Sequence, residues 1–484
     1  MMGQISLVLF GSFFLLLLIG APIYLALGAS SILTISVFQL DPLAVLPSIV
    51  QGSTASFTLL AIPLFILAGN LLGGAELTKR LVDLARTIVG DMPGGLAVVS
   101  VAVGIFFAGI SGSGAADTAA IGAIMIPSMI QDGYDKGFAA ALVAADGAIG
   151  IIIPPSIGLI IYGVVANVSI GDLFIAGVIP GIVVGLCLAA VSVLTARRKG
   201  WGRSRGPGHD LSANDGSAAR AGKSDSGSIA AHGDLPGQPA TAPARGVLTA
   251  TQPTATPKRR FDRLIAMAVA TRRAGWGLLA PIIILGGIYG GIFTPTESAG
   301  VVVVYALFTG LVIYRDLTFT RILKVVVQSA RTTGVVMIIL ATATLFALIL
   351  NTQGIAAQIT SALTTSGLGK FGTLLVIDVL LIVAGAFLDV IGTYYILLPI
   401  LLPVVLPLGI DPVHFGIITT VALAISLTLP PVGLNLYVAS AIADVPVGRI
   451  VRSLAPVFAA EFAALLLITY IPGLSLGLPH LLGS

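Results

Sequence analysis

The sequence predicts an all-α polytopic membrane protein with two inverted-topology repeats. Hydrophobic residues make up 56% of its 484 residues and charged residues only 10%, too little charge to cover a soluble protein of this size. Six residues also recur 276 positions later: Pro127, Gly133, Asp135, Pro154, Pro155 and Pro180 return as Pro403, Gly409, Asp411, Pro430, Pro431 and Pro456. Proline breaks helices, so both halves are predicted to break at matching places.

The first half, residues 1–198, is predicted to contain five spanning segments and one re-entrant hairpin. Its elements are three spans, an interfacial helix, the hairpin, a broken span and a last span, at 4–20, 22–38, 57–73, 75–90, 94–130, 138–167 and 174–196. Each span approaches the roughly 20 apolar residues that cross a bilayer. Charges at helical spacing make 75–90 amphipathic. The hairpin arms are short and flank Ser-Gly-Ser-Gly at 111–114.

The second half, residues 261–484, repeats this order. Its three spans, lateral segment, hairpin, broken span and last span are predicted at 276–293, 296–314, 334–350, 354–370, 373–409, 413–443 and 455–472. The tip of its hairpin is predicted near 389–393. The second tandem proline, Pro430-Pro431, breaks the broken span.

The number of spans determines the orientation of the halves. Five is odd, so the second half must be inserted upside down relative to the first. With both termini outside, 24 of the 25 Lys and Arg residues fall inside and only Lys370 falls outside, as the positive-inside rule requires. An alternative joins the first two apolar runs into one long tilted helix and moves the N-terminus inside.

Residues 199–260 differ in composition from the rest. They are rich in Gly, Ser, Ala, Pro and Asp, and such a segment cannot bury a core, so we expect a disordered cytoplasmic connector. A passive linker is favoured over a regulatory segment. Its basic ends are expected to lie near anionic headgroups, and because the basic residues gather beside the membrane, the charge does not indicate a nucleic-acid partner.

The helix breaks and hairpin tips are the places where chemistry is expected. Non-helical backbone at membrane depth is tolerated only against protein or a water-filled cavity, and matching breaks in two halves indicate a transporter's binding site. Free carbonyls there suit Na⁺, while the helix N-termini that follow suit an anion. Hydroxyls come from Ser111, Ser113, Ser156 and Thr393. The competing interpretation is that small residues here only permit tight helix packing.

Six acids lie in apolar surroundings, where a carboxylate is costly unless it is paired or protonated. They are Asp117, Asp146, Glu297, Asp378, Asp389 and Glu461. Asp389 is the strongest candidate because it opens the second hairpin tip. Asp117 is expected to cap or ligate, and Glu297 to stabilise a helix N-terminus. Glu461 and Asp378 are expected to lie away from the breaks, and Asp146 has no assigned role.

Seven motifs resemble the large membrane subunit of tripartite ATP-independent periplasmic (TRAP) transporters. They are FFAGISGSGAADTAAIG (106–122), MIPSM (125–129), IIPPSI (152–157), TPTESA (294–299), LPILLP (398–403), GIDPVHFGI (409–417) and LPPVGLNL (429–436). The resemblance implies a sodium-driven elevator in the bacterial inner membrane that imports organic acids. It also implies two partners, a small four-helix membrane subunit and a periplasmic substrate-binding protein.

The resemblance also implies which residues bind. Substrate is expected at Ser111, Ser113, Ser156 and Asp389. The family usually has a threonine directly before the second Pro-Pro, where this chain departs from the pattern with Leu429; Thr428, one residue earlier, is expected to substitute for it. The expected Na⁺ ligands are Ser111, Gly112, Ser113, Pro154, Asp389, Gly392, Thr393, Thr428 and Pro430. In the implied elevator, segments 94–167 and 373–443 move as one body against a scaffold built from the other spans.

Three other functions remain open. A one-component sodium–carboxylate symporter would transport without a binding protein. A passive channel is also open, but two closed-ended hairpins suit a transporter with alternating access better than a channel. An intramembrane enzyme is disfavoured because no nucleophile–base pair is found, and the four histidines lie in the connector, beside the second broken span and at the C-terminus. We therefore expect a transporter and not an enzyme.

Overall fold

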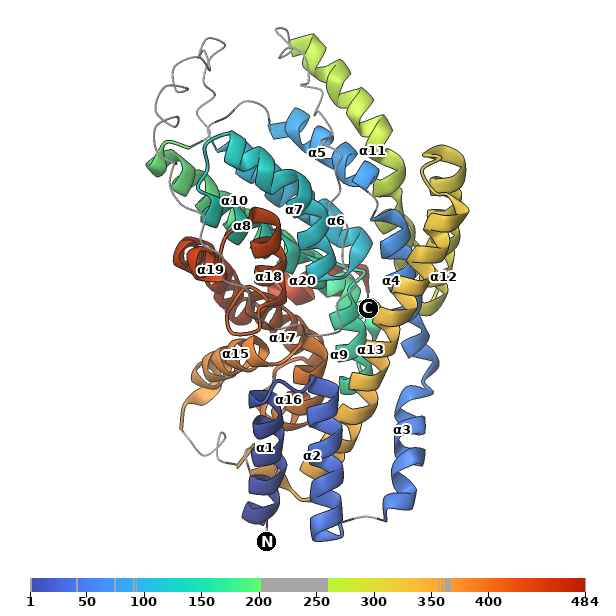
Figure 1. Cartoon of the computed structure of the whole chain (residues 1–484), viewed down its shortest axis with the longest axis vertical. Helices are drawn as coiled ribbons and strands as arrows, with labels where there is room; N and C mark the ends of the chain where they lie inside the picture. Colours follow the sequence, from blue (N-terminus) through green and yellow to red (C-terminus); the bar gives the residue numbers. More distant parts are fainter. Residues whose placement is uncertain are drawn as a thin grey trace, which may run out of the picture. The chain divides into compact units, whose positions relative to one another are not determined.

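Helices make up every regular element in the part of the chain that the structure, a computed structural model, describes (Figure 1). The described residues are 2–40, 42–73, 75–89, 92, 94–201, 260–355, 357–358, 360–361 and 367–483. They belong to one compact unit, residues 1–203 and 266–484, except for the first residues of α11. The predicted connector lies outside the described residues, apart from its ends, and so does part of the lateral segment 354–370.

Six of the described helices are long and apolar enough to cross a membrane alone. They are α10 (Ile170–Lys199), Met267–Tyr289 of α11 (Arg260–Tyr289), α12 (Pro295–Phe308) with the π-helical η4 (Thr309–Ile313), α13 (Phe319–Thr352), α15 (Gly369–Phe387) and α19 (Val447–Tyr470). Most of the other described helices are shorter and apolar. The prediction of an all-helical, multi-pass membrane protein is therefore confirmed.

The first two apolar runs form two helices, α1 (Met2–Leu18) and α2 (Ile23–Phe38). Gly20 takes a φ of +84°, and its N–H and that of Ala21 bond back to the end of α1. The chain therefore turns, and α1 and α2 pack side by side (Figure 1). The alternative of one long tilted helix is wrong.

The third predicted span, 57–73, is the second part of a bent pair. Leu43–Thr54, which includes η1 (Leu43–Val45) and α3 (Leu46–Thr54), meets Phe57–Leu72, which includes η2 (Phe57–Leu60) and α4 (Ala61–Leu72), at 61°. The hydroxyls of Ser53 and Thr54 donate to the Val50 carbonyl, so they compete with the helical ladder at the bend. The sequence analysis missed α3 because these polar residues interrupt the apolar run.

The amphipathic helix is present as α5 (Ala75–Val89). Leu77, Leu81 and Ala85 are buried, whereas Lys79 and Asp83 are exposed. The buried face packs on α6. The predicted amphipathic character of this segment is confirmed.

The first hairpin consists of α6 (Gly95–Ser111) and α7 (Gly114–Gln131), joined by Gly112-Ser113. The broken span follows as α8 (Lys136–Ala148), η3 (Ile149–Ile151) and α9 (Ile157–Ala166). The Asp135 side chain caps α8 by accepting from Phe138 N at 3.0 Å. The Pro154-Pro155 peptide bond in the break is cis.

Residues 369–443 of the second half contain the helices predicted for its hairpin and broken span. Its hairpin consists of α15 and α16 (Val390–Val405), and its broken span of α17 (Pro412–Ser426) and α18 (Leu434–Ala443). Asp411 caps α17, and Pro430-Pro431 is again cis. The tip is shorter than predicted, because Asp389 caps α16 and residues 390–393 already form its first turn.

Two helices extend beyond their predicted spans, and one was missed. α13 begins at Phe319 rather than 334, because Thr318 Oγ1 accepts from Arg321 N and caps a charged first section. α19 begins at Val447 rather than 455. The short C-terminal helix α20 (Gly473–Leu482) was not predicted.

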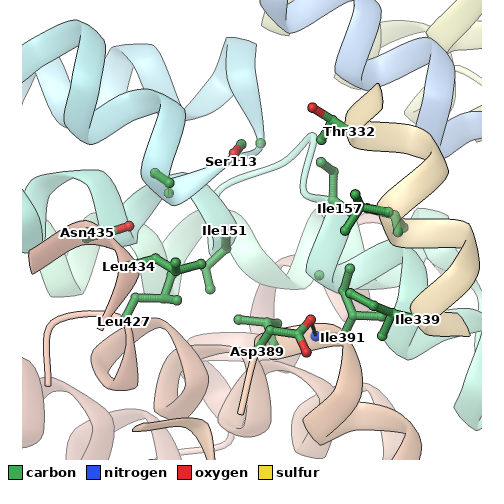
Figure 2. A pocket seen from close by; sticks show the side chains of 17 residues that line it. Ser113, Ile151, Ile157, Thr332, Ile339, Asp389, Ile391, Leu427, Leu434 and Asn435 are labelled. Carbon is green, nitrogen blue, oxygen red and sulfur yellow. Dashed lines mark hydrogen bonds between the residues drawn. The ribbon is translucent and has the colours of Figure 1, made fainter. Parts of the chain in front are cut away.

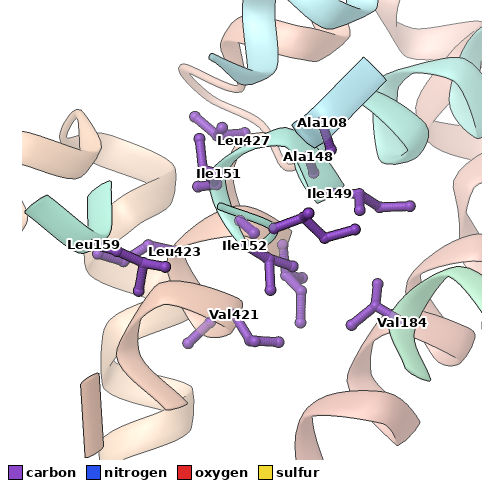
Figure 3. Packing of buried hydrophobic residues seen from close by; sticks show 14 of the residues in the cluster. Ala108, Ala148, Ile149, Ile151, Ile152, Leu159, Val184, Val421, Leu423 and Leu427 are labelled. Carbon is purple, nitrogen blue, oxygen red and sulfur yellow. The ribbon is translucent and has the colours of Figure 1, made fainter. Parts of the chain in front are cut away.

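The helices after each break pack against the other half of the chain. α9 packs on α16 and α17, while α18 packs on α7 and α8. Figure 3 shows buried residues from α6, α8, α10 and α17 meeting around the first break. α10 and α19 pack on each other and on these elements, whereas α13 packs with α2, α3, α4 and α16. The sequence analysis expected α10 and α19 in the scaffold, and in this structure they also contact the hairpins and broken spans.

Candidate functional site

A cavity of about 420 Å³ lies where both hairpin tips and both breaks meet α13 (Figure 2). It is lined by residues from the first tip, the first break, α13, the second tip and the second break: Gly112, Ser113, Gly114, Ala115, Ile151, Ile157, Gly158, Thr332, Val335, Val336, Ile339, Asp389, Val390, Ile391, Leu427, Leu434 and Asn435. The lining is mostly apolar with a few polar groups, as in small-molecule sites. Figure 2 shows Ser113 and Asp389 on opposite sides of this space.

Glycine at the first tip allows a very close approach of backbone to backbone. Gly112 has a φ of +64°, and a Cβ there would lie 2.5 Å from the Pro155 carbonyl oxygen. A Cβ on Gly114 would lie 3.0 Å from the Leu427 side chain and 3.2 Å from Asn435. The first tip is therefore packed between the two breaks, and no side chain fits at Gly112 without displacing them.

The two serines of the first tip have different surroundings. Ser113 is the N-cap residue of α7, but its side chain makes no capping hydrogen bond, and it lines the cavity. Ser111 is only 7% exposed, and its hydroxyl accepts from Ser113 N at 3.3 Å. Ser113 therefore presents its hydroxyl to the cavity, while Ser111 helps to hold the turn.

At the second tip, Asp389 lines the cavity and caps α16. Its Oδ2 accepts from Ile391 N at 3.1 Å, and its Oδ1 accepts from Gly392 N at 3.3 Å. Each carboxylate oxygen can accept more than one hydrogen bond or ligate a cation. Asp389 thus keeps a fixed orientation and still has acceptor capacity for a ligand.

Three predicted hydroxyl ligands are buried and already bonded within the protein. Ser156 donates to the Ile151 carbonyl at 2.5 Å and caps α9. Thr393 donates to the Asp389 carbonyl at 2.8 Å. Thr428 donates to the Ile425 carbonyl at 2.7 Å and lies 3.3 Å from Glu461 Oε2.

The predicted site residues thus separate into two groups. Gly112, Ser113 and Asp389 come together at the cavity. The other seven predicted site residues do not line the cavity: Ser111, Pro154, Ser156, Gly392, Thr393, Thr428 and Pro430.

Sequence reasoning missed two polar residues of the cavity, Asn435 and Thr332. Asn435 is fully buried; its Nδ2 donates to the Ala144 carbonyl at 3.0 Å, and its Oδ1 has no partner among the described residues. Its position just after the second break was the signal that could have found it. Thr332 lies in the section of α13 that falls between the predicted spans 296–314 and 334–350.

Asp117, one turn beyond the first tip, is fully buried. Ser111 approaches its carboxyl, yet neither carboxylate oxygen has a hydrogen bond of ordinary geometry in the described part of the chain. A Cβ on Gly150 would lie 1.9 Å from its Oδ2, so the carboxylate faces the backbone of the first break. A buried, unpaired carboxylate beside free backbone is a natural place for a cation.

The remaining acids have hydroxyl or backbone partners. Asp146 accepts from Ser100, Asp378 accepts from Thr469 at 3.0 Å, and Glu461 from Thr428 at the second break. Glu461 was expected to lie away from the breaks, but it lies against Thr428 at the second break. Glu297 and Thr294 form a capping box on α12, so the structural interpretation of Glu297 is confirmed.

Comparison with known protein families decides what kind of protein carries this site. Residues 10–474 match the family described as "Tripartite ATP-independent periplasmic transporter, DctM component". The chain belongs to this family. It is a transporter permease component and not an enzyme, as the sequence predicted, and its TRAP resemblance is confirmed.

Individual relatives are similar over most of the chain. The C4-dicarboxylate TRAP transporter large permease protein DctM of Pseudomonas aeruginosa is 38% identical over 458 residues, which cover 95% of this chain and 94% of the relative. The isethionate TRAP transporter permease protein DctMQ of Oleidesulfovibrio alaskensis is 38% identical over 467 residues, but this chain spans only 65% of that relative. The sialic acid TRAP transporter large permease protein SiaM of Vibrio cholerae is 33% identical over 430 residues, 89% of this chain and 88% of SiaM.

A solved structure shares the fold at low sequence identity. The Alcanivorax borkumensis YdaH transporter aligns with a TM-score of 0.56 and 13% identity, over 91% of this chain and 89% of YdaH. This similarity supports the fold alone.

Proposed function

We propose that this chain is the large transmembrane subunit of a sodium-coupled secondary transporter that imports an organic acid delivered by a periplasmic binding protein. The observation that carries the proposal is the cavity in which both hairpin tips and both breaks meet α13. The TRAP large permease relatives named for C4-dicarboxylate, isethionate and sialic acid support an organic-acid substrate.

The charge around the cavity supports sodium coupling. Among the described residues that line the cavity, Asp389 alone has an ionisable side chain, and none of them is Lys, Arg or His. An organic anion there would meet a carboxylate in apolar surroundings, which is unfavourable without a compensating positive charge. The N-termini of α7 and α16 supply partial charge, and Na⁺ bound by Asp389 and Asp117 would supply the rest.

We infer two Na⁺ sites at the two tips. The first is built around Asp117, Ser111 and the carbonyls of the first break, because Asp117 is buried without a partner. The second is built around Asp389 and the carbonyls at the second tip. Hydroxyl, carboxylate and carbonyl oxygens are the hard ligands that Na⁺ requires. The described residues contain no cluster of three or more His, Cys, Asp or Glu side chains that could hold a metal ion.

We further propose that the hairpins and broken spans move as one body, as an elevator. The packing of α9 on the second half and of α18 on the first half supports a single body. α10 and α19 belong to this body, since they pack on it. α13 contributes one wall of the cavity from the scaffold, and an inverted repeat would supply two arrangements of similar energy facing opposite sides.

The partners in this proposal are a small membrane subunit and a periplasmic binding protein. The family description names a tripartite, periplasmic system. The DctMQ relative is longer than this chain, which spans 65% of it, so the additional part of such a relative would correspond to the small subunit. We place the N- and C-termini on the periplasmic side and the connector in the cytoplasm.

Sodium coupling is tested by uptake into proteoliposomes that contain the chain, its small subunit and the cognate binding protein. Radiolabelled succinate, isethionate and sialic acid serve as probes. Uptake of the accepted probe should require an inward Na⁺ gradient and stop when K⁺ replaces Na⁺. Undiminished uptake driven by a proton gradient without Na⁺ would refute the coupling, and full uptake without the binding protein would favour a one-component symporter.

The moving body is tested by disulfide cross-linking in a chain whose Cys187 is replaced by Ala. A Cβ on Gly109 of α6 would lie 3.2 Å from Pro281 Cβ of α11, close to the separation that a disulfide requires. Oxidised Gly109→Cys/Pro281→Cys should therefore stop transport, and reduction should restore it. In the matched control, Gly28→Cys/Thr342→Cys joins α2 to α13 within the scaffold, where a Gly28 Cβ would lie 3.6 Å from Thr342 Cβ. If the first pair forms fully and transport continues, the rigid-body elevator is wrong.

A further inference from the structure

A second cavity, of about 620 Å³, lies between the amphipathic helix α5 and the start of the apolar part of α11. It is lined by residues of α5 and α11: Lys79, Arg80, Asp83, Thr87, Val269, Ala270 and Arg273. Three cations and one acid line it, so its charge is positive. We propose that this cavity binds the phosphate of an anionic phospholipid headgroup.

Tyr314 contacts the Arg80 guanidinium and the backbone of Arg273 in this cavity. The Arg80 guanidinium lies 3.9 Å from the centre of the Tyr314 ring, a cation–π distance. The Tyr314 hydroxyl donates to the Arg273 carbonyl at 3.3 Å and accepts from Gly277 N at 3.1 Å. Arg80 Nη1 also lies 3.5 Å from the Arg273 carbonyl. Because the two helices and the guanidinium are fixed beforehand, binding an anion needs little further ordering.

The sequence of α11 places the cavity at the level of the lipid headgroups. Arg272 and Arg273 come directly before the apolar section of the helix, and Trp276, one turn on, is 41% exposed. Basic residues followed by an aromatic residue mark the membrane–water interface. Leu77 of α5 packs against Gly277, where a Cβ would lie 2.2 Å from Leu77 Cδ1, so α5 lies at the same level.

The side chains that line the cavity favour a lipid over a free phosphate. Arginine binds phosphate oxygens through a planar fork of N–H donors, and lysine adds a point charge. The side of the cavity formed by α11 contains Val269, which is 44% exposed, beside Ala270. A molecule with a phosphate and an acyl chain matches this arrangement, because its head meets the cations and its chain lies along apolar α11.

Lipid binding is tested on the purified full-length chain by native mass spectrometry with phosphatidylglycerol, phosphatidylcholine and inorganic phosphate as probes. Each exposed cation near anionic lipid contributes about a fivefold factor, so Lys79→Gln/Arg80→Gln/Arg273→Gln should weaken phosphatidylglycerol binding about a hundredfold. Asp83→Asn removes the acid and should strengthen it about fivefold. A gain of binding cannot result from misfolding, so this variant keeps the test valid if the triple variant is unstable.

The matched control removes three charges from a basic run without a cavity. Arg197→Gln/Arg198→Gln/Lys199→Gln at the exposed end of α10 should leave the tightly bound phosphatidylglycerol in place. Equal losses in the control and the cavity variant would show diffuse attraction and overturn the site. Inorganic phosphate that binds as tightly as phosphatidylglycerol, or phosphatidylcholine that binds equally well, would overturn the assignment to an anionic lipid.

Discussion

The two hairpin tips differ at corresponding residues. Gly112 makes the first turn with a φ of +64°, whereas Leu388, 276 positions later, takes a φ of −112° and is 7% exposed. The next residues, Ser113 and Asp389, are both N-cap residues. The first tip therefore depends on close backbone packing, and the second depends on a buried side chain and a carboxylate cap.

The two tips carry a hydroxyl and a carboxylate at the same two positions, the N-cap and one turn later, but in opposite order. At the first tip the hydroxyl of Ser113 is at the cap and the carboxylate of Asp117 lies one turn later. At the second tip the carboxylate of Asp389 is at the cap and the hydroxyl of Thr393 lies one turn later. Each half thus brings one carboxylate to the site, but only Asp389 lines the cavity, while Asp117 is buried behind the tip. We infer that Asp117 serves a cation alone and that Asp389 serves both cation and substrate.

The largest expected effect is therefore on the two carboxylates. Asp117→Asn and Asp389→Asn should each lower the rate of Na⁺-driven uptake about a hundredfold, because removing one partner of a buried charge pair costs about 2–5 kcal/mol. Titrations with Na⁺ and with substrate separate the roles: Asp117→Asn should weaken Na⁺ dependence alone, and Asp389→Asn should weaken both.

Glu297→Gln is the matched control for these variants. It removes a carboxylate from the capping box of α12, away from the cavity lining. Uptake by this variant should stay near normal. Equal behaviour of Asp117→Asn and Asp389→Asn in both titrations would contradict the difference between the tips.

The next effect concerns the backbone of the first tip. Gly112→Ala should stop transport and lower the free energy of unfolding by about 3 kcal/mol, because it adds a clash with the Pro155 carbonyl to a left-handed backbone. Gly133→Ala is the control, since Gly133 has a φ of +87° with nothing within 4 Å of a Cβ. It should cost only about 1 kcal/mol and leave transport intact, as measured by thermal unfolding and uptake.

The hydroxyls give a smaller contrast. Ser113→Ala should lower uptake about tenfold, because its hydroxyl faces the cavity, and the loss of one ligand or hydrogen bond to a charged group is worth about 1.5 kcal/mol. Thr393→Val should change uptake less than about twofold, since the Thr393 hydroxyl bonds within α16. A larger loss in Thr393→Val than in Ser113→Ala would show that Thr393 is a ligand after all.

The sequence predicted the order of the elements better than their side-chain contacts. Prolines, glycines and apolar runs act locally, so the hairpins, the broken spans and α5 could be placed from them. Which hydroxyl faces the cavity depends on rotamers and on packing between halves. Ser156 and Thr428 therefore turned out to bond internally, whereas Asn435 reaches the cavity only because α18 packs on α7 and α8.

Charge patterns also misled the placement of α13. Arg321, Lys324 and Arg331 precede the predicted span 334–350, but a helix can extend beyond the apolar core of a membrane while its charged side chains remain solvated. The extra turns bring Thr332 to the cavity. A helix cap at Thr318 was the local signal for this start.

The smallest expected effect is at the caps of the two broken spans. Asp135 caps α8 and pairs with Arg449 of α19 at 2.9 Å, with side chains 30% and 52% exposed. Asp411 caps α17 by accepting from Val413 N at 2.7 Å, and no ion pair to it occurs among the described residues. Burial alone would raise the pKa of Asp135, but hydrogen bonds from Arg449 and Phe138 N lower it overall.

A lowered pKa in the folded state means that this interaction stabilises the fold above the ordinary pKa of aspartate, about 3.9, and is lost as the pH falls through the lower, folded-state value. Asp135→Asn keeps the cap, so it should cost only about 0.5 kcal/mol at neutral pH, as expected for an exposed ion pair. Thermal unfolding of purified chain at pH 7 and at about pH 3 should show this difference shrinking in acid. A cost for Asp135→Asn that stays constant in acid would mean that the ion pair contributes nothing beyond the cap.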